Sequence, residues 1–77
     1  MLEIKVGQIW EHFKNKQYKI IAIAKDDNLQ EYVVYEALYD NPVSKVWIRT
    51  KENFTDNIIK DGKEIPRFSL IMTYSPD

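Results

Sequence analysis

Two short runs of this chain could build a small binding pocket. In residues 30–39, alternation places Tyr35 on one face of a strand, because successive side chains point to opposite faces. Residues 46–49 place Trp47 and Arg49 together on one face of the next strand. Aromatic bodies beside an ionisable group suit the recognition of a peptide or a small ligand. The same pattern is also typical of an ordinary β core with a polar rim.

His12 and two arginines extend this candidate pocket. His12 is the only histidine, so no metal cluster built on histidines and no two-histidine acid/base pair can form. Arginine can stack on aromatic rings or hold a carboxylate or phosphate with two hydrogen bonds. The alternative is a structural His12 and surface ion pairs for the arginines, to Glu36, Glu52 or Glu64, that contribute only about 0–1 kcal/mol. The predicted ligand-binding residues are His12, Tyr35, Trp47, Arg49 and Arg67.

A weakly basic edge could instead contact phosphates. The net charge is −1, yet residues 1–25 carry five lysines against two glutamates. Lys14, Lys16 and Lys19 are the possible phosphate contacts, with Trp10 or Tyr18 available for stacking on a base. A solvated turn is the favoured interpretation of these lysines.

No residue set predicts a reaction. Ser44, Ser69 and Ser75 have no paired base in their sequence context. The acidic run at 26–31 lacks the spaced acidic-glycine loop of a calcium site, so we read it as a solvated turn. We therefore assign no catalytic residue, no metal ligand and no cofactor, and an enzyme ranks below both binding hypotheses.

Length and composition predict one small domain. The 77 residues form a single β domain with a core over 7–72 and a loose tail over 73–77. There is no cysteine, so aliphatic and aromatic residues must supply the stability of the fold. No apolar run approaches the roughly 18 residues of a membrane span, and residues 1–5 lack the apolar stretch of a signal peptide. We expect a cytoplasmic protein without a membrane partner.

Alternation and turn residues predict strands over most of the chain. The expected strands are 8–14, 18–25, 30–39, 45–50, 58–60, 63–65 and 66–72, with a long strand at 30–39 that must bend. The fold class is therefore all-β. We expect a small SH3-like, partly open barrel, or a strongly bent antiparallel sheet, of five to six strands with one short helical turn.

Three local signals define the connections. Asn15 tolerates a positive φ and so predicts a tight turn after the first strand. Thr50 can cap a helical turn over 51–55 that directs Phe54 inward. Asp61 and Gly62 lie between two apolar runs and predict a type I′ hairpin, in which both turn residues need a positive φ.

The same alternation divides side chains between core and pocket. We expect the core to be filled by three aliphatic or aromatic pairs, which are Ile9 with Phe13, Val34 with Leu38, and Val46 with Ile48. The opposite faces then carry the pocket residues. In a closed barrel those faces could equally be the interior.

A series of motifs resembles a known bacterial family. The motifs lie at 7–14, 18–24, 31–39, 46–49, Phe54 and 61–68, and together they span 7–71. They resemble the family catalogued as domain of unknown function 1653. The resemblance implies a stand-alone β domain or a module of a larger protein, and it implies no activity.

The chain departs from the family pattern at three places. Asn15 replaces a glycine that usually follows the His-aromatic-Lys motif, and Thr50 replaces a proline that usually follows the Trp-x-Arg motif. The turn at 26–28 lacks the histidine often present in relatives and is one residue shorter. Any chemistry of that histidine is therefore absent from this chain.

Two functions follow from these residues. The first is a non-enzymatic binding module that offers the aromatic-plus-arginine face to a protein segment or a small ligand. The second is a nucleotide- or nucleic-acid-binding domain that uses the basic turn and stacking aromatics, and it is less favoured. In either case we expect a monomer or a weak homodimer.

Overall fold

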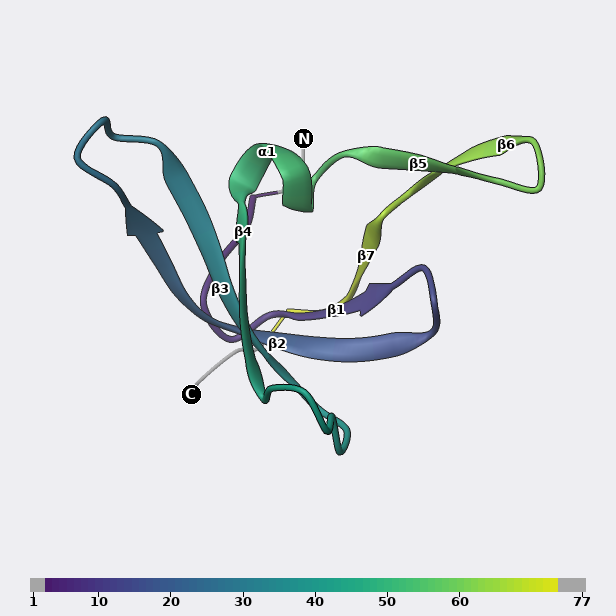
Figure 1. The fold of residues 1–77 in the computed structure, drawn as a ribbon, viewed down its shortest axis with the longest axis horizontal. Helices are drawn as coiled ribbons and strands as arrows, with labels where there is room; N and C mark the ends of the chain where they lie inside the picture. The colour runs from purple at the N-terminus through teal and green to yellow at the C-terminus, as the bar shows by residue number, and fades with distance from the viewer. Residues whose placement is uncertain (1–2, 74–77) are drawn as a thin grey trace.

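The computed structural model describes residues 3–73 and consists of seven strands and one helical turn (Figure 1). The predicted tail at 73–77 lies outside the described residues except for Thr73. The elements follow one another as β1 (Ile9–His12), β2 (Lys16–Lys25), β3 (Glu31–Ala37), β4 (Val46–Thr50), α1 (Lys51–Phe54), β5 (Asn57–Lys60), β6 (Lys63–Pro66) and β7 (Phe68–Met72).

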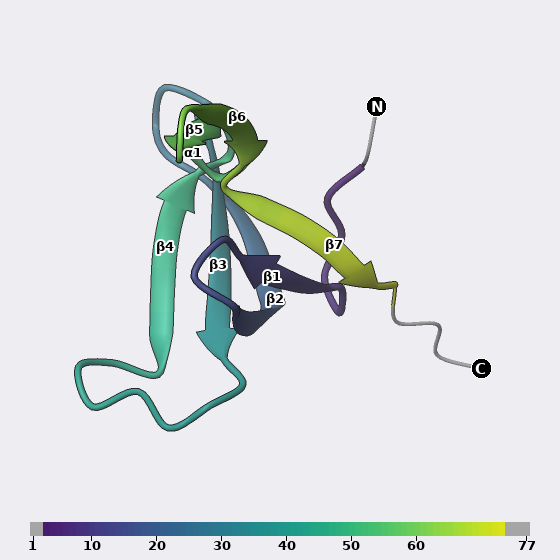
Figure 2. The ribbon, with the colours of Figure 1, turned by 90° about the vertical axis from the view of Figure 1, so that its right-hand side faces the viewer.

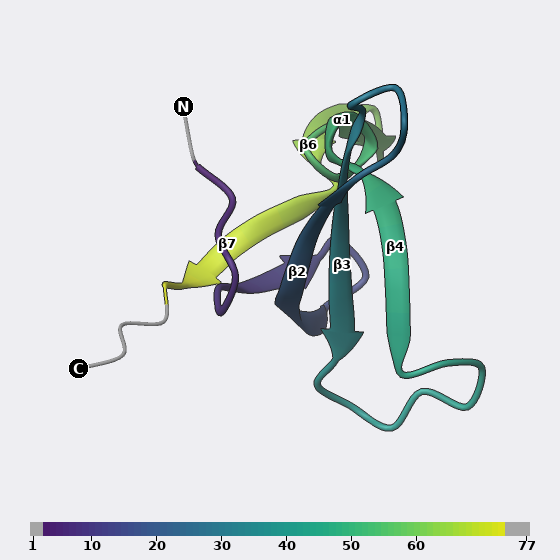
Figure 3. The same cartoon turned by 90° about the vertical axis from the view of Figure 1, so that its left-hand side faces the viewer.

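Five strands form one antiparallel sheet in the order β4-β3-β2-β1-β7, while β5 and β6 pair only with each other. The all-β prediction with a single helical turn is confirmed. Figure 2 shows β7 running beside β1, and Figure 3 shows β2, β3 and β4 side by side. Within the described residues the sheet stays open, with β4 and β7 at its edges.

The large sheet has five strands, within the predicted five to six, and β5 and β6 form a separate hairpin because the chain changes sheet at Arg67. β6 ends at Pro66, which pairs with Asn57 in the small sheet, and β7 begins at Phe68, which pairs with His12 in the large one. Between them the Arg67 amide donates to the Asp56 carbonyl, and the Arg67 carbonyl accepts from the Phe13 amide.

The longest strand, and the one whose pairing changes partway along, is β2 rather than the predicted strand at 30–39. β2 has ten residues, whereas β3 has seven. Its first residues pair with β1 and its later ones with β3, and the register shifts between Ile20 and Ala22. An extra residue at such a bulge bends a strand and increases its twist, so β1 and β7 run in a different direction from β3 and β4 (Figure 3).

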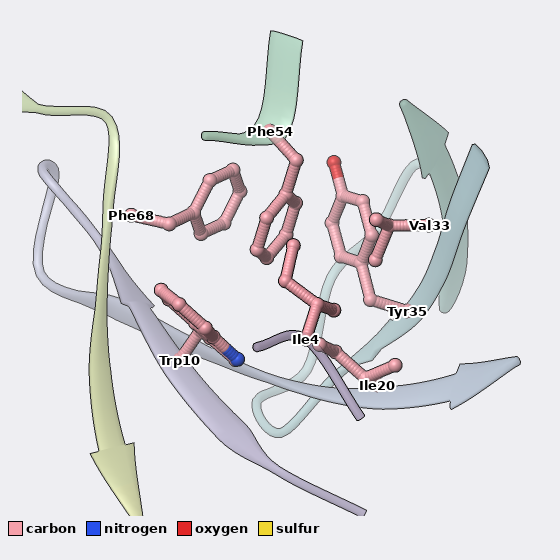
Figure 4. Packing of buried hydrophobic residues seen from close by; sticks show 7 residues of the cluster. All are labelled: Ile4, Trp10, Ile20, Val33, Tyr35, Phe54 and Phe68. Atoms are coloured by element: carbon pink, nitrogen blue, oxygen red, sulfur yellow. The ribbon is translucent and has the colours of Figure 1, made fainter. Parts of the chain in front are cut away.

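The core is centred on aromatic rings. Phe54 of α1 is fully buried and stacks on Phe68 of β7, with ring centroids 4.1 Å apart and planes inclined by 11°. Trp10 and Tyr35 meet Phe54 edge-on at 5.3 Å and 5.5 Å. Figure 4 shows Phe54 standing between Phe68 and Tyr35 above the sheet. Aromatic pairs in such offset and edge-on arrangements add about 0.5–1.5 kcal/mol each to the free energy of area burial.

The predicted aliphatic core is wrong. Val46 and Ile48 are 47% and 60% exposed, and Leu38 is exposed as well. The buried members of β3 are instead Val33, Tyr35 and Ala37, which are the alternate residues of that strand. The bend encloses the face that carries the larger rings, because that face meets Phe54 and Phe68, while the other face has no covering layer in the described structure.

The predicted turns and the helical cap are confirmed. Asn15, Asp61 and Gly62 all have positive φ, at 66°, 53° and 75°. The Thr50 hydroxyl accepts a hydrogen bond from the Asn53 amide at 3.1 Å, which caps α1. Leu29, which the sequence did not single out, also has a positive φ of 64°.

We expect Gly62→Ala to lower the free energy of unfolding by about 1 kcal/mol, because alanine resists the positive φ of the turn. An added Cβ would meet no atom within 4 Å, so backbone conformation alone causes the loss. Urea denaturation measures it. Gly62→Asn is the control and should lose less, since asparagine tolerates this conformation. Equal stability of Gly62→Ala and the parent chain would contradict the hairpin turn.

Phe54→Ala should destabilise the fold by about 3–5 kcal/mol, because it removes the ring on which three other aromatic residues pack. Circular dichroism during thermal unfolding measures the change. Val43→Ala, at a position that is 80% exposed, should stay within about 0.5 kcal/mol of the parent chain. Comparable melting of the two variants would show that the ring stack does not hold the domain together.

Candidate functional site

A concavity of about 340 Å³ lies on the enclosed side of the sheet and contains four of the five predicted ligand-binding residues. His12 comes from β1, Tyr35 from β3, and Trp47 and Arg49 from β4. The other residues that line this concavity, called the pocket below, are Lys14, Lys16, Tyr18, Tyr39, Asn41 and Phe68.

Strand register brings the pocket residues together. Tyr35 lies directly opposite Trp47 in the β3–β4 pair, and Val33 lies opposite Arg49. Trp47 is held in place because its indole N–H donates to the Ser44 carbonyl at 2.9 Å. Trp47 and Arg49 therefore share one face, as alternation along β4 requires.

Arg49 is fixed by neutral partners. Its Nε donates to the Tyr35 hydroxyl at 3.0 Å, and its Nη1 donates to the Asn53 side-chain oxygen. The guanidinium carbon lies 5.9 Å from the centroid of the Phe68 ring, within the range of a cation–π contact. Over residues 3–73, Arg49 forms no ion pair and its Nη2 has no hydrogen-bond acceptor.

His12 is neutral at pH 7. Burial and the positive charges of Arg49, Lys14 and Arg67 lower its pKa from 6.5 to about 4. Its Nδ1 accepts a hydrogen bond from the Lys14 amide at 3.3 Å, so the proton of the neutral ring is assigned to Nε2. The ring meets Phe68 edge-on at 4.9 Å.

Three tyrosines contribute hydroxyl groups to the pocket. The hydroxyls of Tyr18 and Tyr39 lie 2.6 Å apart, and Asn41 Nδ2 donates to Tyr39 at 2.8 Å. Burial and the bond to Tyr39 raise the pKa of Tyr18, and burial raises the pKa of Tyr35. The hydroxyls of Tyr18 and Tyr35 therefore stay protonated at neutral pH.

The three predicted phosphate contacts are divided by the fold. Lys14 and Lys16 line the pocket, and the Lys16 ammonium lies 5.0 Å from the Tyr39 ring centroid. Lys19 is half-buried on β2 and is not part of the lining. Trp10 is only 4% exposed and donates its N–H to Gln8, so it cannot stack on a nucleobase as the sequence suggested.

Arg67 lies outside the lining of the pocket. Its Nε and Nη2 donate to the Asp56 carboxylate at 2.7 Å and 3.3 Å, and this pair lowers the pKa of Asp56. The partner is none of the three glutamates that the sequence suggested. The ion pair reinforces the bend between β6 and β7, where the Arg67 and Asp56 backbones also meet.

Sequence reasoning missed Tyr39, Asn41 and Phe68 as pocket residues. Tyr39 follows Ala37 by two positions, so the alternation of side chains along a strand placed it on the same face as Tyr35. Phe68 lies in the expected strand 66–72, and nothing in the sequence distinguished it from an ordinary aromatic residue of the core. Asn41 lies in the loop between β3 and β4, and no pattern in the sequence indicated its direction.

Within residues 3–73, no group of three or more histidine, cysteine or acidic side chains is placed to hold a metal ion. Asp26 of the acidic run accepts from the amides of Asn28 and Gln30, which orders the turn before β3. Within residues 3–73 there is no helix that is long and apolar enough to cross a membrane.

Comparison with known proteins gives a family and a fold. The model of a family described as a protein of unknown function (DUF1653) matches residues 8–70. The crystal structure of a DUF1653 protein from Bordetella bronchiseptica is similar, with a TM-score of 0.79 and 21% sequence identity, over 97% of this chain and 96% of that one. No curated protein matches the sequence. The match over most of its length shows that this chain belongs to the DUF1653 family.

Proposed function

We propose that this chain is a non-enzymatic binding module whose pocket takes a small ligand or the end of a peptide segment. One observation carries the proposal: His12, Tyr35, Trp47 and Arg49, which come from three strands, line a single concavity. Its volume of about 340 Å³ falls within the range of known ligand pockets. Many small, strongly bent β domains bind ligands, and this analogy of fold is secondary to the geometry of the pocket.

The walls of the pocket are organised before any ligand arrives. Trp47 is tied to the Ser44 carbonyl, and Arg49 is tied to Tyr35 and Asn53. A ligand would therefore lose little free energy to the ordering of these side chains. The long-chain exceptions are Lys14 and Lys16, which are exposed at the rim.

Nucleotide or nucleic-acid binding is the second candidate, because Lys14 and Lys16 line the same pocket as Tyr18. This arrangement places two cations near an aromatic ring, as single-stranded nucleic acids require. Trp10 is buried and Lys19 lies outside the pocket, so two lysines and the ring of Tyr18 are all that remain of the predicted nucleic-acid contacts. We therefore favour the first candidate.

Arg49→Met should abolish ligand binding and leave the chain folded. Methionine retains contact with Phe68 but lacks the guanidinium group, so we expect a stability loss of only about 1–2 kcal/mol from the missing hydrogen bonds. Heteronuclear NMR of the labelled full chain, titrated with aromatic acids, amides and amines and with short peptides, measures binding.

Lys63→Met is the matched control, since it removes one exposed positive charge on β6 away from the pocket. In the parent chain and in this control, ligand-induced shifts should cluster on the residues of the pocket. Shifts that cluster elsewhere, or survive in Arg49→Met, would disprove the proposed site.

A salt titration separates the two candidates. We expect a 15-nucleotide oligothymidine to show no measurable binding at about 150 mM KCl, because only two lysines can reach its phosphates. Fluorescence anisotropy measures the affinity. Tight binding with a steep salt dependence that Lys14→Ala and Lys16→Ala reduce would favour the nucleic-acid candidate instead.

A further inference from the structure

The hydrogen-bonding groups of the pocket are almost all donors. The Tyr35 hydroxyl accepts from Arg49, so its own proton is left to be donated. Tyr18 and Tyr39 share one hydrogen bond between two hydroxyls, which leaves one hydroxyl proton of the pair without an acceptor among the described residues. The proton on His12 Nε2 is a further donor, because Nδ1 is used by the Lys14 amide.

The acceptors near the pocket are already used by the fold. The side-chain oxygen of Asn41 accepts from the amides of Val43 and Ser44, at 2.9 Å and 3.4 Å, and its nitrogen donates to Tyr39. The backbone carbonyl of Ser44, in the same loop, accepts from the indole N–H of Trp47. A ligand would thus meet hydrogen-bond donors and find few acceptors for its own N–H groups.

The charges of the pocket have the same sign. Lys14, Lys16 and Arg49 line it, and no aspartate or glutamate is among its lining residues. None of these three cations forms an ion pair within residues 3–73. Asp56, the acidic group closest in the network, is held by Arg67 on the far side of Asn53.

Three of the donors surround one ring. The guanidinium carbon of Arg49 lies 5.9 Å from the centroid of the buried Phe68 ring, and the ring centroids of Tyr35 and His12 lie 5.5 Å and 4.9 Å from it. Lys14 and Lys16 are exposed and therefore stand at the rim. The pocket thus combines a donor-lined base with positive charge at its mouth and the indole of Trp47 on one side.

We infer that the pocket receives an oxyanion, a carboxylate or a phosphate, carried on an aromatic or apolar body. This inference rests on the proposed binding function and names the chemistry of the ligand. An oxyanion supplies several acceptor lone pairs and one or two negative charges, which match the unpaired donors and the three cations. A neutral amide would bring N–H groups without acceptors, and an amine would add a fourth positive charge.

Four probes of nearly equal shape test the inference: benzoate, phenyl phosphate, benzamide and benzylamine. NMR titration of the full chain should show benzoate and phenyl phosphate binding at the pocket at least tenfold more tightly than benzamide, with benzylamine the weakest. The ratio of the first two tells a carboxylate ligand from a phosphate ligand.

The outcomes separate the inference from the proposed function. Benzamide or benzylamine binding as tightly as benzoate would overturn the oxyanion while leaving the pocket in place. Failure of all four probes and of the fragments and peptides above would overturn the binding function together with the inference. Weaker benzoate binding at high salt, by contrast, is expected.

Tyr35→Phe removes one donor, together with the hydroxyl that holds Arg49 Nε in place, and keeps the ring that packs on Phe54 and Phe68. Benzoate should bind it about five- to tenfold more weakly, whereas benzamide affinity should change less than twofold. Tyr32→Phe is the control on the same strand, because Tyr32 donates to Asp26 outside the pocket. An equal loss of benzoate affinity in both variants would overturn the assignment of Tyr35 as a ligand donor.

Discussion

The stacked rings of Phe54 and Phe68 join the helical turn to the start of an edge strand and form the centre of the core. Phe54 comes from a helical turn of four residues, and Phe68 begins the edge strand β7. Trp10, Tyr35, His12 and Arg49 all contact one ring or the other. A chain of this size buries only about 60% of its unfolded surface, so a few large rings must supply much of the stabilising area. The base of the pocket and the centre of the core are therefore the same group of rings.

A polar network completes this arrangement and gives the pocket its character. Arg49 bonds to Asn53, Asn53 to Asp56, and Asp56 to Arg67, so Arg49 reaches the carboxylate only through the Asn53 amide. The Asp56 carboxylate forms its ion pair with Arg67 at the bend between β6 and β7, and the hydrogen-bond partners of Arg49 are both neutral. The donors that face the pocket are unpaired because the same fold has used the nearby acceptors. Among the buried side chains of residues 3–73, no polar atom lacks a partner, so this imbalance is confined to the accessible cavity.

The family comparison and the geometry contribute different things. The match to DUF1653 and the similar crystal structure establish family and fold, and at 21% identity the structural likeness extends no further. The proposed oxyanion pocket comes from side chains of this chain alone. Lys14 and Lys16 flank Asn15, whose positive φ of 66° turns the chain back along β1 and places both lysines at the mouth. This local geometry links the basic turn and the aromatic face, which the sequence had suggested as alternatives.

Local patterns determined the elements of this protein, and tertiary contacts decided which face became the inside. Asn15, the Thr50 cap and the Asp61-Gly62 turn were readable because each depends on a few neighbouring residues. Alternation also placed Trp47 with Arg49 correctly on one face of β4. It could not say which face would be buried, since Val46 and Ile48 look as suitable for a core as Trp47 does. That choice depended on the bulge in β2 and on Phe54 and Phe68, which reach the sheet from positions distant in the chain. The pairing of Arg67 with Asp56 and the direction of Asn41 were hidden for the same reason, because both arise where separate segments meet in space.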